Sequence, residues 1–171
     1  MKKTIIISGE GGQGVKLIGQ ILGKILAGLG YEVSVDYSFD TAIRGGKIDA
    51  YLTFSDDKID NPIIENADFF IRLSAMAEEG NGTVTICDSE LCKQEKCDSK
   101  TCKIANLPFQ KSAIEKFGNK VMMNMIVLGK ILKMLDIDID KLKFEKILPP
   151  KMLDQNIEAL RYGFNLVEER N

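Results

Sequence analysis

The first segment with residue types suited to binding chemistry is a glycine-rich stretch near the N-terminus. It places four glycines in six positions, between an apolar run and a helical pattern that begins at Val15. Glycine adopts positive φ without penalty and lets a ligand approach the backbone. A helix start adds unpaired N–H groups and a positive dipole end, which suit a phosphate or carboxylate. The stretch reads Gly9, Glu10, Gly11, Gly12, Gln13, Gly14.

This pattern leaves two alternatives open. It fits the G-x-G-x-x-G fingerprint, and the preceding strand and following helix supply the context that the fingerprint needs. A tight strand-to-helix turn that binds no ligand is the competing interpretation. Glu10 argues against anion binding, because its carboxylate would repel a pyrophosphate unless it points away.

A second candidate lies at Arg44, which precedes Gly45 and Gly46. A guanidinium beside flexible residues can offer a fork of donors to a phosphate or to a carboxylate of a partner. An ordinary turn with a solvated arginine is the alternative. The predicted binding residues are therefore Gly9, Gly11, Gly12, Gln13, Gly14, Arg44, Gly45 and Gly46, and no residue is predicted to be catalytic.

Four cysteines at five-residue steps form the third candidate: Cys87, Cys92, Cys97 and Cys102. Such steps rotate by about 140° each on a helix, so the thiols can converge only in a loop or hairpin at about 87–103. With no histidine in the chain, four thiolates indicate zinc or an iron–sulfur cluster. Disulfides and inert thiols remain alternatives, because the C-x2-C knuckle is missing.

The composition narrows the class of protein. A chain of 171 residues, 44% hydrophobic and 28% charged, predicts one globular domain spanning 1–171. A net charge of −2 with both signs mixed gives no indication of nucleic-acid or membrane binding. No apolar run approaches the roughly 20 residues of a membrane span. We read no export signal at the N-terminus, so a cytoplasmic location is expected.

The elements that must position these groups alternate between strand and helix. A buried strand over 3–8, a helix over 15–29 and a strand over 31–37 predict a right-handed parallel unit. Gly19 and Gly23 lie one turn apart and would allow close contact with a strand or with another helix. Further strands are expected at 47–54, 67–73, 82–87 and 103–107, and helices at 112–117, 121–135, 138–147 and 152–169.

Asp36 keeps a dinucleotide-binding alternative open. It lies 36 − 14 = 22 positions beyond Gly14, where such sites place the acidic residue that holds a ribose. A free-standing NAD(P)- or FAD-dependent oxidoreductase is therefore one functional hypothesis. A small metal- or redox-sensing module built on the four cysteines is another.

The ordered landmarks resemble a known family, the gamma subunit or gamma domain of the 2-oxoacid:ferredoxin oxidoreductases. The resemblance covers nearly the whole chain. It rests on Gly9–Val15, on Arg44–Gly46, on Asp88–Ser89, on Gly118–Asn119 with Asn124–Met125 and Leu128–Gly129, and on Asn156–Leu160.

The resemblance implies an α/β, Rossmann-like fold with a mostly parallel sheet, helices on both faces and a helical C-terminal region. It implies oxidative decarboxylation of a 2-oxoacid, such as pyruvate or 2-oxoglutarate, to an acyl-CoA, with electrons passing to ferredoxin. Thiamine diphosphate and iron–sulfur clusters would be held by the alpha, beta and delta-type partner subunits. The gamma chain would support assembly and contact coenzyme A, using the two glycine segments and Arg44.

Two features depart from the family pattern. Tyr37–Ile43 replaces the Tyr-Gly-Pro-Glu-like approach that many members have before the R-G-G element. The cysteine-bearing segment is the second departure. The first change bears on the geometry of the ligand loop, and the second bears on whether this chain holds a metal of its own.

Overall fold

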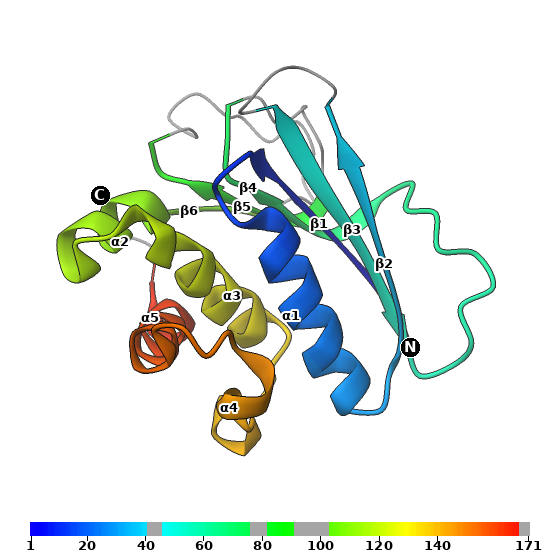
Figure 1. Ribbon diagram of the computed structural model, residues 1–171. Coiled ribbons are helices and arrows are strands. Elements are labelled where there is room, and N and C mark those ends of the chain that lie inside the picture. The colour runs from blue at the N-terminus through cyan, green and yellow to red at the C-terminus, as the bar shows by residue number, and fades with distance from the viewer. Residues whose placement is uncertain (41–45, 76–81, 91–102, 168–171) are drawn as a thin grey trace.

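The computed structural model describes residues 1–40, 46–75, 82–90 and 103–167 (Figure 1). These residues form a sheet with a layer of helices against it. The sheet has the strand order β2-β3-β1-β4-β5-β6. Its strands are β1 Lys2–Glu10, β2 Glu32–Phe39, β3 Lys47–Ser55, β4 Ala67–Arg72, β5 Gly82–Asp88 and β6 Lys103–Leu107.

The first strand lies inside the sheet and connects its two halves. β1 pairs with β4 in parallel, and β4, β5 and β6 continue in parallel. On its other side β1 pairs with β3 antiparallel, and β3 pairs with β2 antiparallel. Among the described strands, β3 therefore runs against all the others, and the predicted α/β class with a mostly parallel sheet is confirmed.

The predicted strand–helix–strand unit is present in a modified form. β2 runs in the same direction as β1, because both are antiparallel to β3. However, β3 lies between them, so the two strands joined by the first helix are not neighbours. The strand bounds were predicted correctly to within two residues, whereas the antiparallel insertion was not foreseen.

The helices that the structure describes gather on one face of the sheet (Figure 1). The expected second helical layer is not found in the described chain. The segment after β3 instead passes over the opposite face, where the Thr53 hydroxyl donates a hydrogen bond to the Pro62 carbonyl at 3.3 Å. The helices are α1 Val15–Gly28, α2 Phe109–Phe117, η2 Lys120–Met122, α3 Met123–Met134, η3 Ile139–Lys141, α4 Phe144–Ile147 and α5 Leu153–Asn165.

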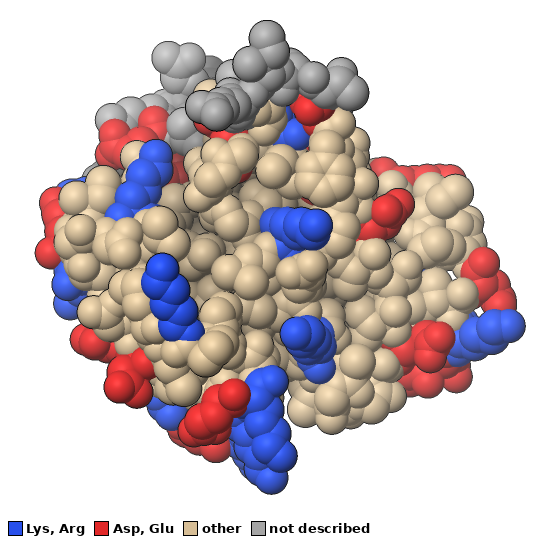
Figure 2. Space-filling model, viewed as in Figure 1, with Lys and Arg blue, Asp and Glu red and all other residues tan. Residues whose placement is uncertain are grey.

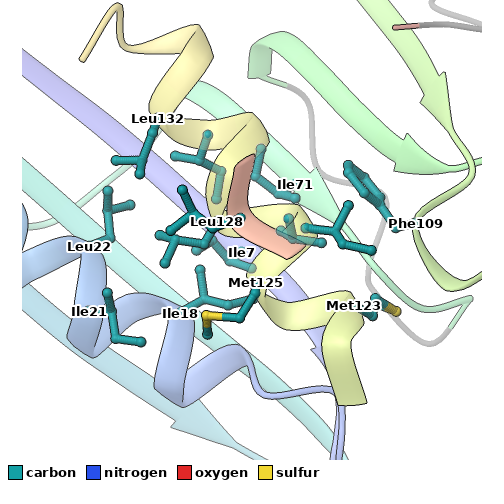
Figure 3. Packing of buried hydrophobic residues seen from close by; sticks show 14 of the residues in the cluster. Ile7, Ile18, Ile21, Leu22, Ile71, Phe109, Met123, Met125, Leu128 and Leu132 are labelled. Carbon is teal, nitrogen blue, oxygen red and sulfur yellow. The ribbon is translucent and has the colours of Figure 1, made fainter. Parts of the chain in front are cut away.

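The hydrophobic core lies between the sheet and the helices α1 and α3 (Figure 3). Ile7 of β1, Leu22 of α1 and Leu128 of α3 are all completely buried there. Met123 and Met125 of α3 are also buried and fill the core between the helices and the sheet. This core fixes α1 against the sheet and so sets where the helix begins.

The last helix packs against α3 at a crossing between two glycines. A Cβ added at Gly129 would overlap the carbonyl oxygen of Leu160, and one added at Gly163 would overlap that of Ile126. The two backbones therefore touch directly. The predicted helical C-terminal region is confirmed, and this contact holds it against the core.

Candidate functional site

The glycine-rich segment connects β1 to α1, as the sequence predicted. Gly12 has a φ of 93° and Gly14 a φ of 80°, so the turn uses the left-handed region twice. Gly14 is the N-cap of α1, no side chain caps the helix, and its first turn contains no acidic residue. The first N–H groups of α1 thus face a position that favours negative charge.

The loop is closed on one side by Gln13. Its side-chain oxygen accepts a hydrogen bond from the Glu10 N–H at 2.7 Å, and its amide nitrogen donates to the Leu73 carbonyl at 2.7 Å. A Cβ at Gly9 would lie 2.6 Å from the Gln13 oxygen. Gly9 and Gln13 therefore hold the loop in place, and the group that remains open to a ligand is the start of α1.

The second glycine segment lies beside the first. The Gly11 N–H donates to the Gly46 carbonyl at 3.1 Å, so the structure brings these two predicted residues together. Arg44 and Gly45 lie outside the described residues, and the contact of the guanidinium with an anion stays a prediction. The register of β3 against β1 places Lys47 opposite Glu10, which accounts for the approach of Gly46 to the loop.

Glu10, which would repel an anion, makes a hydrogen bond of its own. Its carboxylate accepts the hydroxyl proton of Ser74, just beyond the carboxyl end of β4. This bond holds the negative charge of Glu10 at the edge of the sheet where β1 and β4 end. Lys and Arg side chains are interspersed with Asp and Glu over the face shown in Figure 2. Anion binding at α1 would therefore depend on local backbone geometry and not on a broad positive field.

A pocket of about 330 Å³ lies beside the start of α1. Leu17 of the first turn lines it, together with residues of η2, α3 and the segment before α5. Asn124 also lines this pocket and is only 6% exposed. Reasoning from residue types missed Asn124 as a site residue. The available signal was a carboxamide within the apolar run of α3, which appeared only in the family resemblance.

The first turn of α1 is also held from the sheet side. The Tyr37 hydroxyl of β2 donates to the Lys16 carbonyl at 3.3 Å. Burial raises the pKa of this phenol above its ordinary value, so the group stays protonated and keeps donating at neutral pH. Gly19 and Gly23 meet Tyr37 and Val35 across this contact, which confirms the predicted close approach and shows that the partner is a strand.

The structure places one of the four cysteines. Cys87 is completely buried near the carboxyl end of β5 and takes part in a disulfide bond. Cys92, Cys97 and Cys102 lie outside the described residues. Within the described ranges, no group of three or more Cys, Asp or Glu side chains is arranged to hold a metal. A disulfide sulfur is not a thiolate ligand, so a metal held by all four cysteines would require this bond to be reduced, and such a site stays a prediction.

Asp36 does not lie where a dinucleotide site needs its acidic residue. Val35 and Tyr37 face α1, so Asp36 between them faces the opposite side of the sheet. There it lines a second pocket with Ser34 and Tyr51. β3 also separates β2 from β1, whereas a ribose-binding acidic residue follows the strand next to β1. The dinucleotide hypothesis is not favoured.

The fold and the site together define a class, an α/β domain in which an inner strand turns through glycines into an uncapped helix. Residues 4–166 match the pyruvate ferredoxin/flavodoxin oxidoreductase family, and the chain belongs to it. This confirms the expectation that the chain is a subunit of an oxidoreductase of this kind. None of the helices within the described ranges has the length and hydrophobicity of a membrane span.

Individual relatives agree with this assignment. The chain is 30% identical over 171 residues to the 2-oxoglutarate synthase subunit KorC of Archaeoglobus fulgidus, covering 95% of this chain and 87% of that one. Its fold is similar to the keto/oxoacid ferredoxin oxidoreductase gamma subunit of Geobacter sulfurreducens, with a TM-score of 0.75, 22% identity and coverage of 96% and 95%.

A third similarity is to a larger protein. The 2-oxoglutarate:ferredoxin oxidoreductase of Magnetococcus marinus, solved with 2-oxoglutarate, coenzyme A and succinyl-CoA bound, matches with a TM-score of 0.78 and 21% identity. The match covers 95% of this chain and 30% of that one. The fold of this chain therefore also occurs as one part of a longer polypeptide.

Proposed function

We propose that this chain is the gamma subunit of a multisubunit 2-oxoacid:ferredoxin oxidoreductase. The complete enzyme would convert a 2-oxoacid and coenzyme A to an acyl-CoA and carbon dioxide, and pass two electrons to ferredoxin. Relatives named as subunits of 2-oxoglutarate synthase make 2-oxoglutarate the first substrate to test. The gamma chain would take part in assembly and contact coenzyme A.

The observation that carries this proposal is the start of α1. Gly14 caps the helix without a side-chain hydrogen bond, and the first turn contains no acidic residue. Glu10 makes its hydrogen bond to Ser74 and Gln13 bonds to the loop and to Leu73. The N–H groups of α1 are left for a phosphate of coenzyme A. Lys16 is exposed in the same turn and adds positive charge.

The other cofactors belong elsewhere in the assembly. Thiamine diphosphate would supply the carbanion chemistry from a partner subunit, which agrees with the absence of histidine from this chain. The electron-transfer clusters would lie on the partners as well. Zinc or an iron–sulfur cluster at the four cysteines is a separate proposal. Metal analysis of protein prepared without oxygen would test it, and a preparation free of zinc and iron would refute it.

The assembly is tested by isolating the tagged chain from its native cell. We expect a thiamine-binding subunit to accompany it in stable proportion, identified by mass spectrometry. Purification of the chain alone, with no partner retained at low or moderate salt, would refute the assignment.

The coenzyme A contact is tested in the assembled enzyme with a charge reversal. Lys16→Glu places a negative charge in the first turn of α1 and is expected to raise KM for coenzyme A by about threefold to tenfold. Lys24→Glu is the matched control, since Lys24 is exposed on the same helix farther from its start. Equal effects of the two variants would contradict a phosphate at the helix start.

A further inference from the structure

The outer side of β2 has no neighbouring strand among those that the structure describes. β2 is the last strand on its side of the sheet (Figure 1), and it pairs with β3 along its whole length without a bulge. Natural proteins commonly protect such an edge with lysine, proline or a bulge. The eight residues of β2 include neither lysine nor proline. β2 therefore offers a regular edge to which another strand can pair.

Alternate residues of β2 direct their backbone groups away from β3. In an antiparallel pair, successive residues point their N–H and C=O groups toward the partner strand and away from it in turn. The Asp40 N–H donates to the Lys47 carbonyl at 2.9 Å, whereas the Tyr37 N–H donates to the Asp36 carboxylate at 2.8 Å. The outward set is therefore Val33, Val35, Tyr37 and Phe39, and the Asp36 carboxylate occupies one of its four N–H groups.

One face of β2 beside this edge is apolar. Val35 and Tyr37 face α1, where they meet Gly23 and Gly19, and both are only half-buried. Phe39 lies on the same face, with its ring centroid 6.2 Å from that of Tyr37, and is 54% exposed. A strand added beside β2 would cover this row of side chains. Its own side chains on this face are therefore expected to be apolar.

The opposite face of β2 is acidic. Glu32 and Asp36 lie on this face by alternation and are exposed, and β2 contains no basic residue. Neither carboxylate forms an ion pair within the described ranges. A second copy of β2 would bring only further carboxylates to this face, whereas a strand that carries lysine or arginine would pair with them.

A pocket adjoins Asp36 on the acidic face. The segment after β3 passes beside β2, and the space between them has a volume of about 390 Å³. Ser34 and Asp36 line it from β2, and Tyr51 and the segment 62–64 also line it. Among the described lining residues, Asp36 alone carries a charge. The pocket therefore fits a side chain with an apolar stem and a cationic end, as lysine and arginine have.

We propose that the outer edge of β2 binds an extended segment of a partner subunit, which adds to the sheet as a further strand and places a lysine or arginine against Asp36. Main-chain hydrogen bonds would supply affinity and the alternating side chains specificity. A basic group that draws the Asp36 carboxylate away would also release the Tyr37 N–H for the added strand. The inference rests on the proposed function, because it identifies where this chain joins the assembly.

The test is residue-resolved hydrogen exchange of β2 in the isolated chain and in the assembled enzyme. In the isolated chain, the outward N–H groups of Val33 and Val35 should exchange rapidly, and the inward groups of Ser34 and Asp36 should exchange slowly because they are bonded to β3. Assembly should slow exchange at Val33 and Val35 by about tenfold or more. Ser34 and Asp36 should remain protected in both states.

Variants separate backbone pairing from charge. Val35→Pro removes an outward N–H that β3 does not use, at an edge position where proline is tolerated, and Val35→Ala is its control because it keeps the N–H. Asp36→Lys reverses the charge, and its control is Glu158→Lys, which makes the same change at an exposed position of α5. Val35→Pro and Asp36→Lys should each raise Kd for the partner subunit by about tenfold, and the controls by less than about threefold. Thermal unfolding of each variant checks its fold.

The possible failures are distinguishable. Unchanged exchange at Val33 and Val35 in an assembled enzyme that retains the chain would overturn the inference and leave the proposed function standing. Protection that appears in the isolated chain as its concentration rises would overturn it in favour of a second copy. A chain that joins no partner subunit would refute the proposed function together with this inference, and the purification reveals that result before any exchange is measured.

Discussion

Gly12 and Gly14 both bend the loop before α1, yet their surroundings differ. Gly12 has no heavy atom within 4 Å of an added Cβ, whereas Gly14 faces Asn124 at 2.8 Å. Gly12→Ala should therefore lower the free energy of unfolding by only about 1–2 kcal/mol, the cost of holding alanine in the left-handed region. Gly14→Ala should cost about 3 kcal/mol or more, because the side chain of Asn124 must also move. Urea unfolding measures both.

The contact with Asn124 can be isolated within this pair. Asn124→Gly removes the opposing side chain. In the double variant, Gly14→Ala should therefore lose only the stability that the left-handed backbone costs, and the loss caused by the steric overlap with Asn124 should disappear. Equal costs for Gly12→Ala and Gly14→Ala would show that Asn124 does not press on the N-cap in solution.

At the residue scale, the sequence predicted which residues form the turn, because the preference for glycine at a positive φ depends only on the local backbone. It did not predict what fills the turn. Gln13 was expected among the ligand contacts, yet its side chain bonds to Glu10 and Leu73. Asn124 reaches Gly14 only through the packing of α3. Such contacts depend on the tertiary arrangement, which residue types and spacing do not encode.

At the scale of elements, the close crossing of α3 and α5 depends on two glycines, Gly129 and Gly163, which have no side chain. Gly129→Ala or Gly163→Ala would place a methyl group on the backbone of the facing helix. Helices cannot separate by this amount without opening the core around Leu128 and Leu160, both of which are fully buried. We expect each variant to lose at least about 3 kcal/mol of unfolding free energy.

Gly28→Ala is the matched control for this prediction. Gly28 ends α1, and a Cβ there would meet no heavy atom within 4 Å. The substitution should change stability by less than about 1 kcal/mol, in the stabilising direction, since alanine is the better helix former. A Gly163→Ala protein as stable as Gly28→Ala would contradict the close crossing.

Element existence was predictable, and element pairing was only partly so. The 3.6-residue and two-residue periods revealed the main helices and each strand. The sequence predicted a close contact at Gly19 and Gly23, with a strand or another helix, and the structure shows that the partner is the sheet. The partner of Gly129 was not predictable, because Gly163 lies on another helix and neither segment contains a pattern that indicates which helix it packs against.

For the whole molecule, the strand order has the largest effect on which ligand site the fold can form. A strand over 47–55 was expected, yet alternation does not reveal whether it adds beside β2 or inserts between β1 and β2. The insertion of β3 moves β2 to the edge of the sheet. It also leaves the dinucleotide motif incomplete, although the glycine spacing and Asp36 both fit that motif in the sequence.

This topology predicts which ligands stabilise the protein. A ligand that binds only the folded chain at a hundred times its Kd adds about 2.7 kcal/mol to the unfolding free energy. Coenzyme A should therefore raise Tm through the start of α1, and NAD(P) and FAD should not raise it beyond what their phosphates achieve alone. Asp36→Ala should leave every one of these shifts unchanged, because Asp36 faces away from α1 across the sheet. Saturable NAD binding that disappears in Asp36→Ala would mean that the β1–α1–β2 unit serves a dinucleotide despite the inserted strand.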